Sequence, residues 1–129
     1  MLTVRAAAAQ VVTQILAMKG SLSSLLPPIS AKIPENDRAL LQELCFGTCR
    51  FYPQLHAYTE CLLDKPLRAK DGDVQALLLL GLYQLLHTRI PDHAAIGETV
   101  EVTRHIKKPW ATKLVNGVLR SFQRDSARI

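Results

Sequence analysis

Residues 74–88 form an almost unbroken apolar segment, VQALLLLGLYQLLHT. A helix that is apolar on nearly all sides is typical of a position in the middle of a helical bundle. Gly81 interrupts the segment at an expected cost of about 1 kcal/mol relative to alanine, and a close approach by a neighbouring helix would account for it. The longest apolar run, Ala76–Tyr83, is much shorter than the ~20 residues of a membrane span. The segment therefore predicts a buried central helix in a soluble protein.

The remainder of the chain also carries helical signals, and no stretch alternates between apolar and polar residues as a strand would. The only connection of any length is residues 64–73. We expect the first two helices at 2–18 and 22–26. The third is expected to begin at 34–37 and to end at a break at Pro53, and the fourth to continue from there to about residue 63. The last three are expected at 74–88, 92–106 and 109–125. The sequence thus predicts an all-α, compact seven-helix bundle that forms a single domain over residues 1–129.

Glycine, serine, proline and aspartate mark the expected helix ends. Gly20 follows the first helix, at a point where a left-handed conformation is favoured. Ser21 is a suitable cap for the second helix, and the Pro27–Pro28 pair is expected to stop that helix. Carboxylates that cap a helix are expected at Asp71 or Asp73 and at Asp92.

Positive charge is concentrated at the C-terminal end of the chain. The 129 residues have a formal net charge of +5, from 16 basic and 11 acidic side chains. From residue 104 onward seven basic residues stand against the single acid Asp125 and give +6, so residues 1–103 carry −1. This asymmetry favours a polyanionic partner for one surface, although a basic end that only aids solubility has the same composition. Because aromatic residues make up only 5%, base stacking is not expected to be the main source of nucleic-acid affinity.

The predicted helix at 109–125 gathers cations on one face. At 100° per residue, Lys113, Arg120 and Arg124 fall within about 40° of one another, opposite the apolar side chains. Forked arginine donors beside an unobstructed glycine backbone suit the phosphates of a nucleic acid. The candidate binding residues here are Lys107, Lys108, Lys113, Asn116, Gly117, Arg120 and Arg124. The alternative is an ordinary solvated helix face, with Gly117 serving helix packing.

The sequence contains no residue pattern that is typical of a metal site or a catalytic site. Cys45 and Cys49 lie one helical turn apart, a spacing that allows chelation, but no further cysteine or histidine follows at matching spacing. Their apolar neighbours favour small buried side chains. With Cys61 they make an odd number, which predicts reduced thiols in the cytoplasm. The dispersed glycines form no loop that could hold a nucleotide or S-adenosylmethionine. We expect no metal site and no catalytic residue in this chain.

Motifs in the last third of the chain resemble those of the NusB-like family, whose members are all-helical RNA-binding domains. The resemblance is carried by LLLLGLYQLL, IP, AIGETVEV and KLVNGVL. Within the family, LLQELCFG, LLHTRIPDHAA and NGVLRSFQR are similar to the N-terminal domain of small-subunit ribosomal RNA cytosine-C5 methyltransferases. Freestanding antitermination factors of the family usually have asparagine at the position of Gly97 and an acid at that of Arg120. The resemblance therefore favours the methyltransferase-associated domain.

The resemblance implies a non-catalytic domain that binds ribosomal RNA and helps to position it for an attached methyltransferase. Arg5 matches one member of a basic run that contacts RNA at the start of such domains. Cytosine-C5 methyltransferases resemble one another in a nucleophilic cysteine directly after a proline, and none of the three cysteines here follows proline. This chain is therefore expected to lack the catalytic nucleophile, and without a glycine-rich loop it is expected to hold no cofactor. Catalysis and S-adenosylmethionine are expected in a C-terminal methyltransferase domain, to which the charged run RSFQRDSARI would lead. The alternatives are a scaffold that docks that domain, or an antitermination factor.

Overall fold

The structure is a computed structural model of the chain and describes residues 2–126. Within that range it contains helices and no strand, which confirms the predicted all-α class. The helices are α1 (Val4–Leu16), α2 (Leu22–Ser30), α3 (Arg38–Arg50), α4 (Tyr52–Leu62), α5 (Gly72–His87), α6 (Asp92–His105) and α7 (Ala111–Ser126). Two 3₁₀ turns, η1 (Glu35–Asp37) and η2 (Ala69–Asp71), precede α3 and α5.

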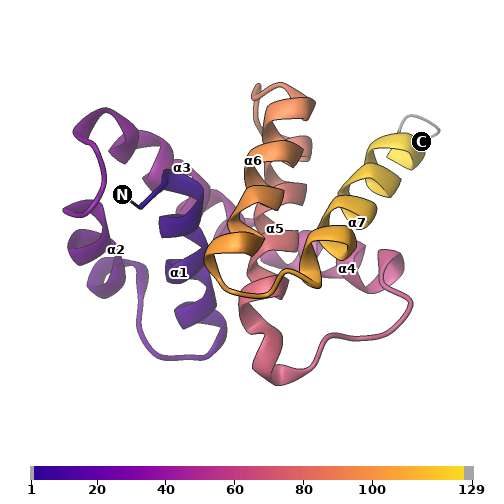
Figure 1. Cartoon of the computed structure of the whole chain (residues 1–129). Coiled ribbons are helices and arrows are strands. Elements are labelled where there is room, and N and C mark those ends of the chain that lie inside the picture. The colour runs from indigo at the N-terminus through magenta and orange to yellow at the C-terminus, as the bar shows by residue number, and fades with distance from the viewer. Residues whose placement is uncertain (1, 127–129) are drawn as a thin grey trace.

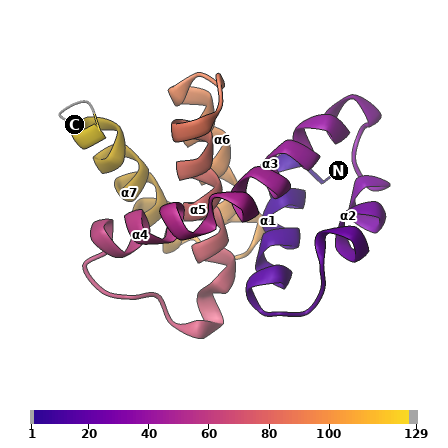
Figure 2. The same cartoon turned by 180° about the vertical axis from the view of Figure 1, so that it is seen from behind.

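The apolar helix α5 lies in the middle of the bundle, as its sequence predicts. It contacts α1, α3, α4, α6 and α7, and Figure 1 shows α1, α2 and α3 on one side of it and α7 on the other. Seen from behind, α4 lies beside α5 and α7 (Figure 2). Every residue from Ala76 to Gln84 is buried, and each buried leucine contributes roughly 1.5–3 kcal/mol. None of the helices described is both long enough and apolar enough to cross a membrane.

Gly81 marks a close approach between α5 and α7. A Cβ atom added at Gly81 would lie 2.6 Å from Cδ1 and 2.7 Å from Cδ2 of Leu119. Leu119 is fully buried, so these methyl groups are part of the core. The predicted close approach of a neighbouring helix is confirmed, and that helix is α7. The contact fixes which face of α7 points outward.

The second helix does not stop where local signals predict. It continues to Ser30, with the Pro27–Pro28 pair inside it, although proline was expected to end it. Pro27 and Pro28 lack the amide hydrogens that would otherwise bond to the carbonyls of Ser23 and Ser24. Both serine residues are exposed, so water can bond to these carbonyls instead. Leu26 is buried and Ile29 packs against the core. Hydrophobic packing therefore outweighs the proline signal in this helix.

At the junction of α1 and α2, the predicted cap residue is confirmed and the predicted left-handed residue is wrong. Ser21 caps α2 as predicted, because its hydroxyl accepts a hydrogen bond from the amide of Ser24 at 3.2 Å. The left-handed residue that ends α1 is Met18, with φ of 58°, and not Gly20. The Met18 amide bonds to the carbonyl of Ile15 at 2.9 Å. The chain therefore leaves the helix two residues earlier than the glycine signal indicates.

Two of the three carboxylates predicted as helix caps make no side-chain capping bond. Pro91 occupies the cap position of α6, and Asp92 makes no side-chain capping bond. Asp71 occupies the cap position of α5, also without a side-chain capping bond. Instead, the carboxylates of Asp71 and Asp73 both bind the ammonium group of Lys108. Asp73 Oδ1 also accepts a local hydrogen bond from the Val74 amide at 2.9 Å. At Asp71, however, a partner distant in sequence has replaced the local capping interaction.

Candidate nucleic-acid interface

Helix α7 presents the predicted cations to solvent. Its inner face is buried against α5 and α6 and consists of Ala111, Val115, Val118, Leu119 and Phe122. The outer residues, called the α7 strip from here on, are Lys113, Asn116, Gly117, Arg120 and Arg124, and all of them are exposed. This division follows from the turn of about 100° per residue. The predicted exposure of one cationic helix face is confirmed.

The charged groups of the α7 strip remain accessible to a ligand. Within residues 2–126, Lys113, Arg120 and Arg124 take part in no ion pair. Arg124 donates one hydrogen bond, from Nη2 to Ser121 Oγ at 3.2 Å on the same helix. A Cβ atom added at Gly117 would meet no atom within 4 Å. Helix packing therefore does not explain this glycine, and the strip combines three cations with an open stretch of backbone.

The two lysines that precede α7 have different surroundings. Lys107 is exposed and left-handed, with φ of 60°. Lys108 is half-buried, with Nζ 3.0 Å from Asp71 Oδ1 and 2.6 Å from Asp73 Oδ1. Burial alone would lower the pKa of Lys108, but hydrogen bonds and charge from Asp73 and Asp71 outweigh it and raise the pKa above its usual value. Lys108 is thus a structural cation whose charge is already compensated.

Arg5 lies inside the bundle and apart from the α7 strip. Its side chain is 9% exposed, and its Nη1 lies 3.3 Å from Oε2 of Glu98. Its Nε donates to Gln84 Oε1 at 2.9 Å. Gln84 is fully buried and donates in turn to Thr99 Oγ1 at 2.9 Å. Because its donors already serve α5 and α6, we leave Arg5 out of the candidate interface.

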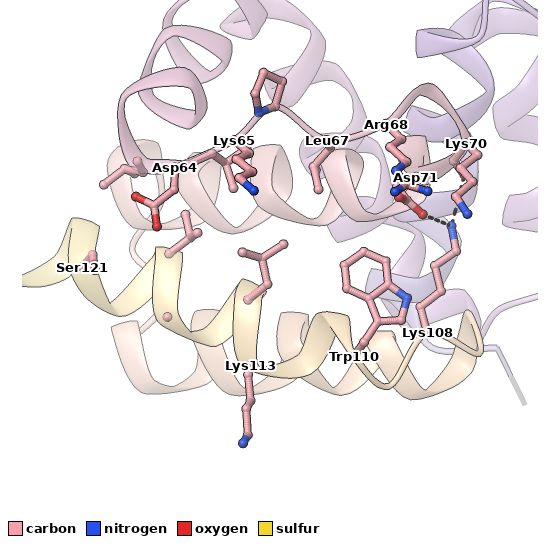
Figure 3. Close-up of a pocket in the computed structure, with 16 residues that line it drawn as sticks. Asp64, Lys65, Leu67, Arg68, Lys70, Asp71, Lys108, Trp110, Lys113 and Ser121 are labelled. Atoms are coloured by element: carbon pink, nitrogen blue, oxygen red, sulfur yellow. Dashed lines mark hydrogen bonds and ion pairs between the residues drawn. The ribbon is translucent and has the colours of Figure 1, made fainter.

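A groove of about 1100 Å³ adjoins the α7 strip. One wall is the loop after α4, called the 63–71 loop, and the other is the start of α7 with the turn before it. Figure 3 shows the Trp110 ring between the two walls and the end of Lys113 pointing away from the loop. Lys113 and Gly117 belong to both the groove and the α7 strip. The groove and the strip are therefore one continuous surface.

Comparison with known proteins places this architecture in a family. The sequence model of the NusB family matches residues 2–124. This chain belongs to the NusB family. Ribosomal RNA small subunit methyltransferase B is 53% identical in Pseudomonas putida, 54% in Pseudomonas syringae and 48% in Escherichia coli. These alignments cover 94–97% of the chain but only 27–29% of each relative, so the chain spans less than a third of their length.

The bundle buries Cys45 and partly buries Cys49, the thiol pair that the sequence spacing singles out. Burial, reinforced by the neighbouring Cys49, raises the pKa of Cys45 to about 12. Burial also raises the pKa of Cys49. The thiolate is the reactive form of cysteine, so both groups stay in their unreactive form near neutral pH. Within the described part of the chain no group of three histidine, cysteine or acidic side chains is placed to hold a metal ion.

Trp110 and the cations of the 63–71 loop are site residues that the sequence patterns do not predict. These cations are Lys65, Arg68 and Lys70, and all three line the groove opposite α7. A signal was present for Trp110, which is the chain's single tryptophan and directly follows the basic break at 107–109. Cations in a loop are usually solvated and carry no signal in the sequence. Their position across the groove from α7 makes these three candidates for binding a ligand.

The Lys108 ion pairs lead to a first prediction. Lys108→Met is expected to lower the free energy of unfolding by about 1–2 kcal/mol, because the carboxylate of Asp71, only 9% exposed, loses its cation. Urea denaturation at pH 7 measures the change. The control is Lys107→Met, which removes an exposed neighbour and is expected to change stability by no more than about 0.5 kcal/mol. Equal losses in both variants would show that the ion pairs do not stabilise the fold.

Proposed function

We propose that this chain binds small-subunit ribosomal RNA and helps to position it for a cytosine-C5 methyltransferase domain of the same protein. The observation that carries the proposal is the α7 strip, which exposes three cations and an amide on one face of a helix anchored in the core. The relatives, named ribosomal RNA small subunit methyltransferase B, indicate the class of nucleic acid. Their greater length leaves room for a separate catalytic domain, with this chain as the N-terminal part.

Contacts with phosphates would supply most of the affinity. Lys113 and Arg124 lie about 16 Å apart along the helix axis, which is long enough to follow several nucleotides of backbone. Arg120 and Arg124 offer forked donors that match phosphate oxygens. Gly117 lets a phosphate approach the helix backbone without obstruction. Such contacts set the register of an RNA on the protein and do not by themselves select a sequence.

In this proposal the chain recognises RNA, and the rest of the full-length protein catalyses methylation. S-adenosylmethionine would supply the methyl group in that catalytic part. The raised pKa values of Cys45 and Cys49 support this division, because a cysteine nucleophile must be deprotonated to attack. The electrostatic character of the α7 strip suits recognition rather than bond formation.

A charge-removal variant tests the proposal. The triple variant Lys113→Gln, Arg120→Gln, Arg124→Gln is expected to bind a fragment of small-subunit ribosomal RNA less tightly and with a weaker salt dependence. Each lost phosphate contact removes about 0.7 from the slope of log Kobs against log salt concentration for a single strand. Loss of all three contacts would therefore reduce the slope by about 2. Filter binding at a series of KCl concentrations measures it.

A second triple variant controls for net charge. Lys19→Gln, Lys32→Gln, Arg89→Gln removes the same charge from exposed positions outside α7 and the groove. This control is expected to keep most of the slope. An unchanged slope in the α7 variant, or equal losses in both, would refute the assignment to the α7 strip. Binding to the remainder of a full-length relative, with no binding to RNA, would instead support the docking alternative.

A further inference from the structure

Trp110 occupies an unusual position for the only tryptophan of the chain. It is 53% exposed, yet its ring lies within the groove between the 63–71 loop and α7 (Figure 3). The aromatic pairs and the cation–π contact within residues 2–126 all involve other rings. No aromatic ring or guanidinium group within residues 2–126 is stacked on the indole, and about half of the residue is accessible to a ligand.

The groove around Trp110 is predominantly cationic. The basic residues that line it are Lys65, Arg68, Lys70, Lys108 and Lys113, and the acidic ones are Asp64 and Asp71. Lys108 is already paired with Asp71 and Asp73, and the end of Lys113 points away from the loop (Figure 3). The cations that remain for a ligand in the groove are Lys65, Arg68 and Lys70. Asp64 lies at the end of the groove near Ser121, away from Trp110 (Figure 3). The part of the groove beside the indole therefore favours an anionic ligand.

The groove is held in shape by the contacts of Lys108. Its Nζ donates to the carbonyl oxygen of Lys70 at 3.1 Å, in addition to the carboxylates of Asp71 and Asp73. These bonds join the end of the 63–71 loop to the turn that carries Trp110. A site held in position before binding loses less conformational entropy when the ligand arrives.

A planar aromatic face, flanking cations and a prearranged groove together define a ligand class. We propose that the groove takes one unpaired base of single-stranded RNA, which stacks on Trp110 while the neighbouring phosphates lie along Arg68 and Lys70 on one side and the α7 strip on the other. The inference rests on the proposed RNA-binding function and deepens it, because it specifies a single-stranded segment. The volume of about 1100 Å³ slightly exceeds the usual range for ligand pockets, about 300–1,000 Å³, so a single base fits within it.

Duplex RNA does not fit this arrangement. In an A-form helix the faces of the bases are covered by their stacked neighbours, so a protein side chain can stack only on a base that is unpaired and splayed out. On the continuous surface formed by the groove and the α7 strip, the two parts would contact different parts of the RNA. Phosphates along the strip supply affinity, and Trp110 supplies a preference for single strands.

The single tryptophan makes the inference directly measurable. A single-stranded oligonucleotide of about 12 nucleotides from small-subunit ribosomal RNA is expected to quench the tryptophan fluorescence of the unmodified chain. The same oligonucleotide annealed to its complement is expected to bind without comparable quenching. Trp110→Leu is expected to weaken single-strand binding about tenfold and to leave duplex binding nearly unchanged. Trp110→Phe keeps a stacking ring and is expected to retain most of the affinity.

Phe46→Leu is the matched control, because Phe46 is also an exposed ring, 55% accessible, but lies on α3 and outside the groove. It is expected to bind both RNAs as the unmodified chain does. RNA binding without quenching, or an unchanged single-strand affinity in Trp110→Leu, would overturn the inference while leaving the α7 strip as the RNA site. Failure of the unmodified chain to bind any RNA would overturn both proposals. Quenching by the remainder of the full-length protein, and not by RNA, would overturn the inference in favour of a protein ligand.

Discussion

Replacing Gly81 with valine is expected to lower the free energy of unfolding by about 3 kcal/mol. The first added carbon would lie 2.6 Å from Leu119 Cδ1, and valine places two methyl groups beyond it. Leu119 is fully buried and cannot turn toward solvent. Helices α5 and α7 must therefore separate, or their neighbours must adopt strained rotamers. For a domain of this size the Tm should fall by about 10 °C, which thermal unfolding followed by circular dichroism would detect.

Gly117→Val is the matched control for this prediction. Both glycines lie within long helices, so the gain in helix propensity, a few tenths of a kcal/mol, is the same. A Cβ atom at residue 117 would meet no atom within 4 Å, and the residue is exposed, so the methyl groups of valine can extend into solvent. The Tm of Gly117→Val should therefore equal or slightly exceed that of the unmodified chain. Similar unfolding temperatures for the two variants would show that the approach of Leu119 does not restrict residue 81.

The positions and buried faces of the helices could be predicted from local patterns. The predicted sixth helix, 92–106, differs from α6 by one residue, and the apolar segment at 74–88 corresponds to the central helix α5. The errors occur where tertiary packing competes with local signals. The Pro27–Pro28 pair is accommodated because α2 packs on the core. Met18 adopts the left-handed turn assigned to Gly20.

The candidate site was only partly predictable, because the pairing state of a cation depends on residues distant in sequence. The helical period alone indicates that Lys113 faces outward, and it does. Lys108 looks equivalent in the sequence, but its partners Asp71 and Asp73 lie 37 and 35 residues away. The groove has the same origin, since a loop after α4 meets the start of α7 across a comparable separation. No pattern within a single element could have identified it.

Arg5 is the clearest case of a cation with a distant partner, because Gln84 is 79 residues away in the sequence. Arg5→Met is expected to lower the free energy of unfolding by about 2 kcal/mol. The reason is that Gln84 Oε1 would lose its donor in a fully buried position. Urea denaturation at pH 7 measures the loss.

A double-mutant cycle separates this explanation from a simple loss of packing. Gln84→Leu alone deprives the guanidinium of Arg5 of a buried partner, whereas Arg5→Met with Gln84→Leu replaces both polar groups by apolar ones. Replacing both members of a buried polar pair often changes the free energy of unfolding very little. The variant also removes the Gln84 amide that donates to Thr99 Oγ1, but the Thr99 hydroxyl can then donate to a carbonyl of its own helix. The double variant should therefore be more stable than the sum of the single losses predicts, by about 1–2 kcal/mol. Additive losses would contradict a direct coupling between the two side chains.

The same variants separate a structural role of Arg5 from an RNA contact. If Arg5 only joins α1 to α5 and α6, the double variant should keep the full salt slope of RNA binding, because the α7 strip is unchanged. If Arg5 instead contacts a phosphate, as the family resemblance implies, the slope should fall by about 0.7 even when stability is restored. The side chain is 9% exposed, with its Nη1 already 3.3 Å from Glu98, so we expect the first result. A reduced slope in the stable double variant would return Arg5 to the interface.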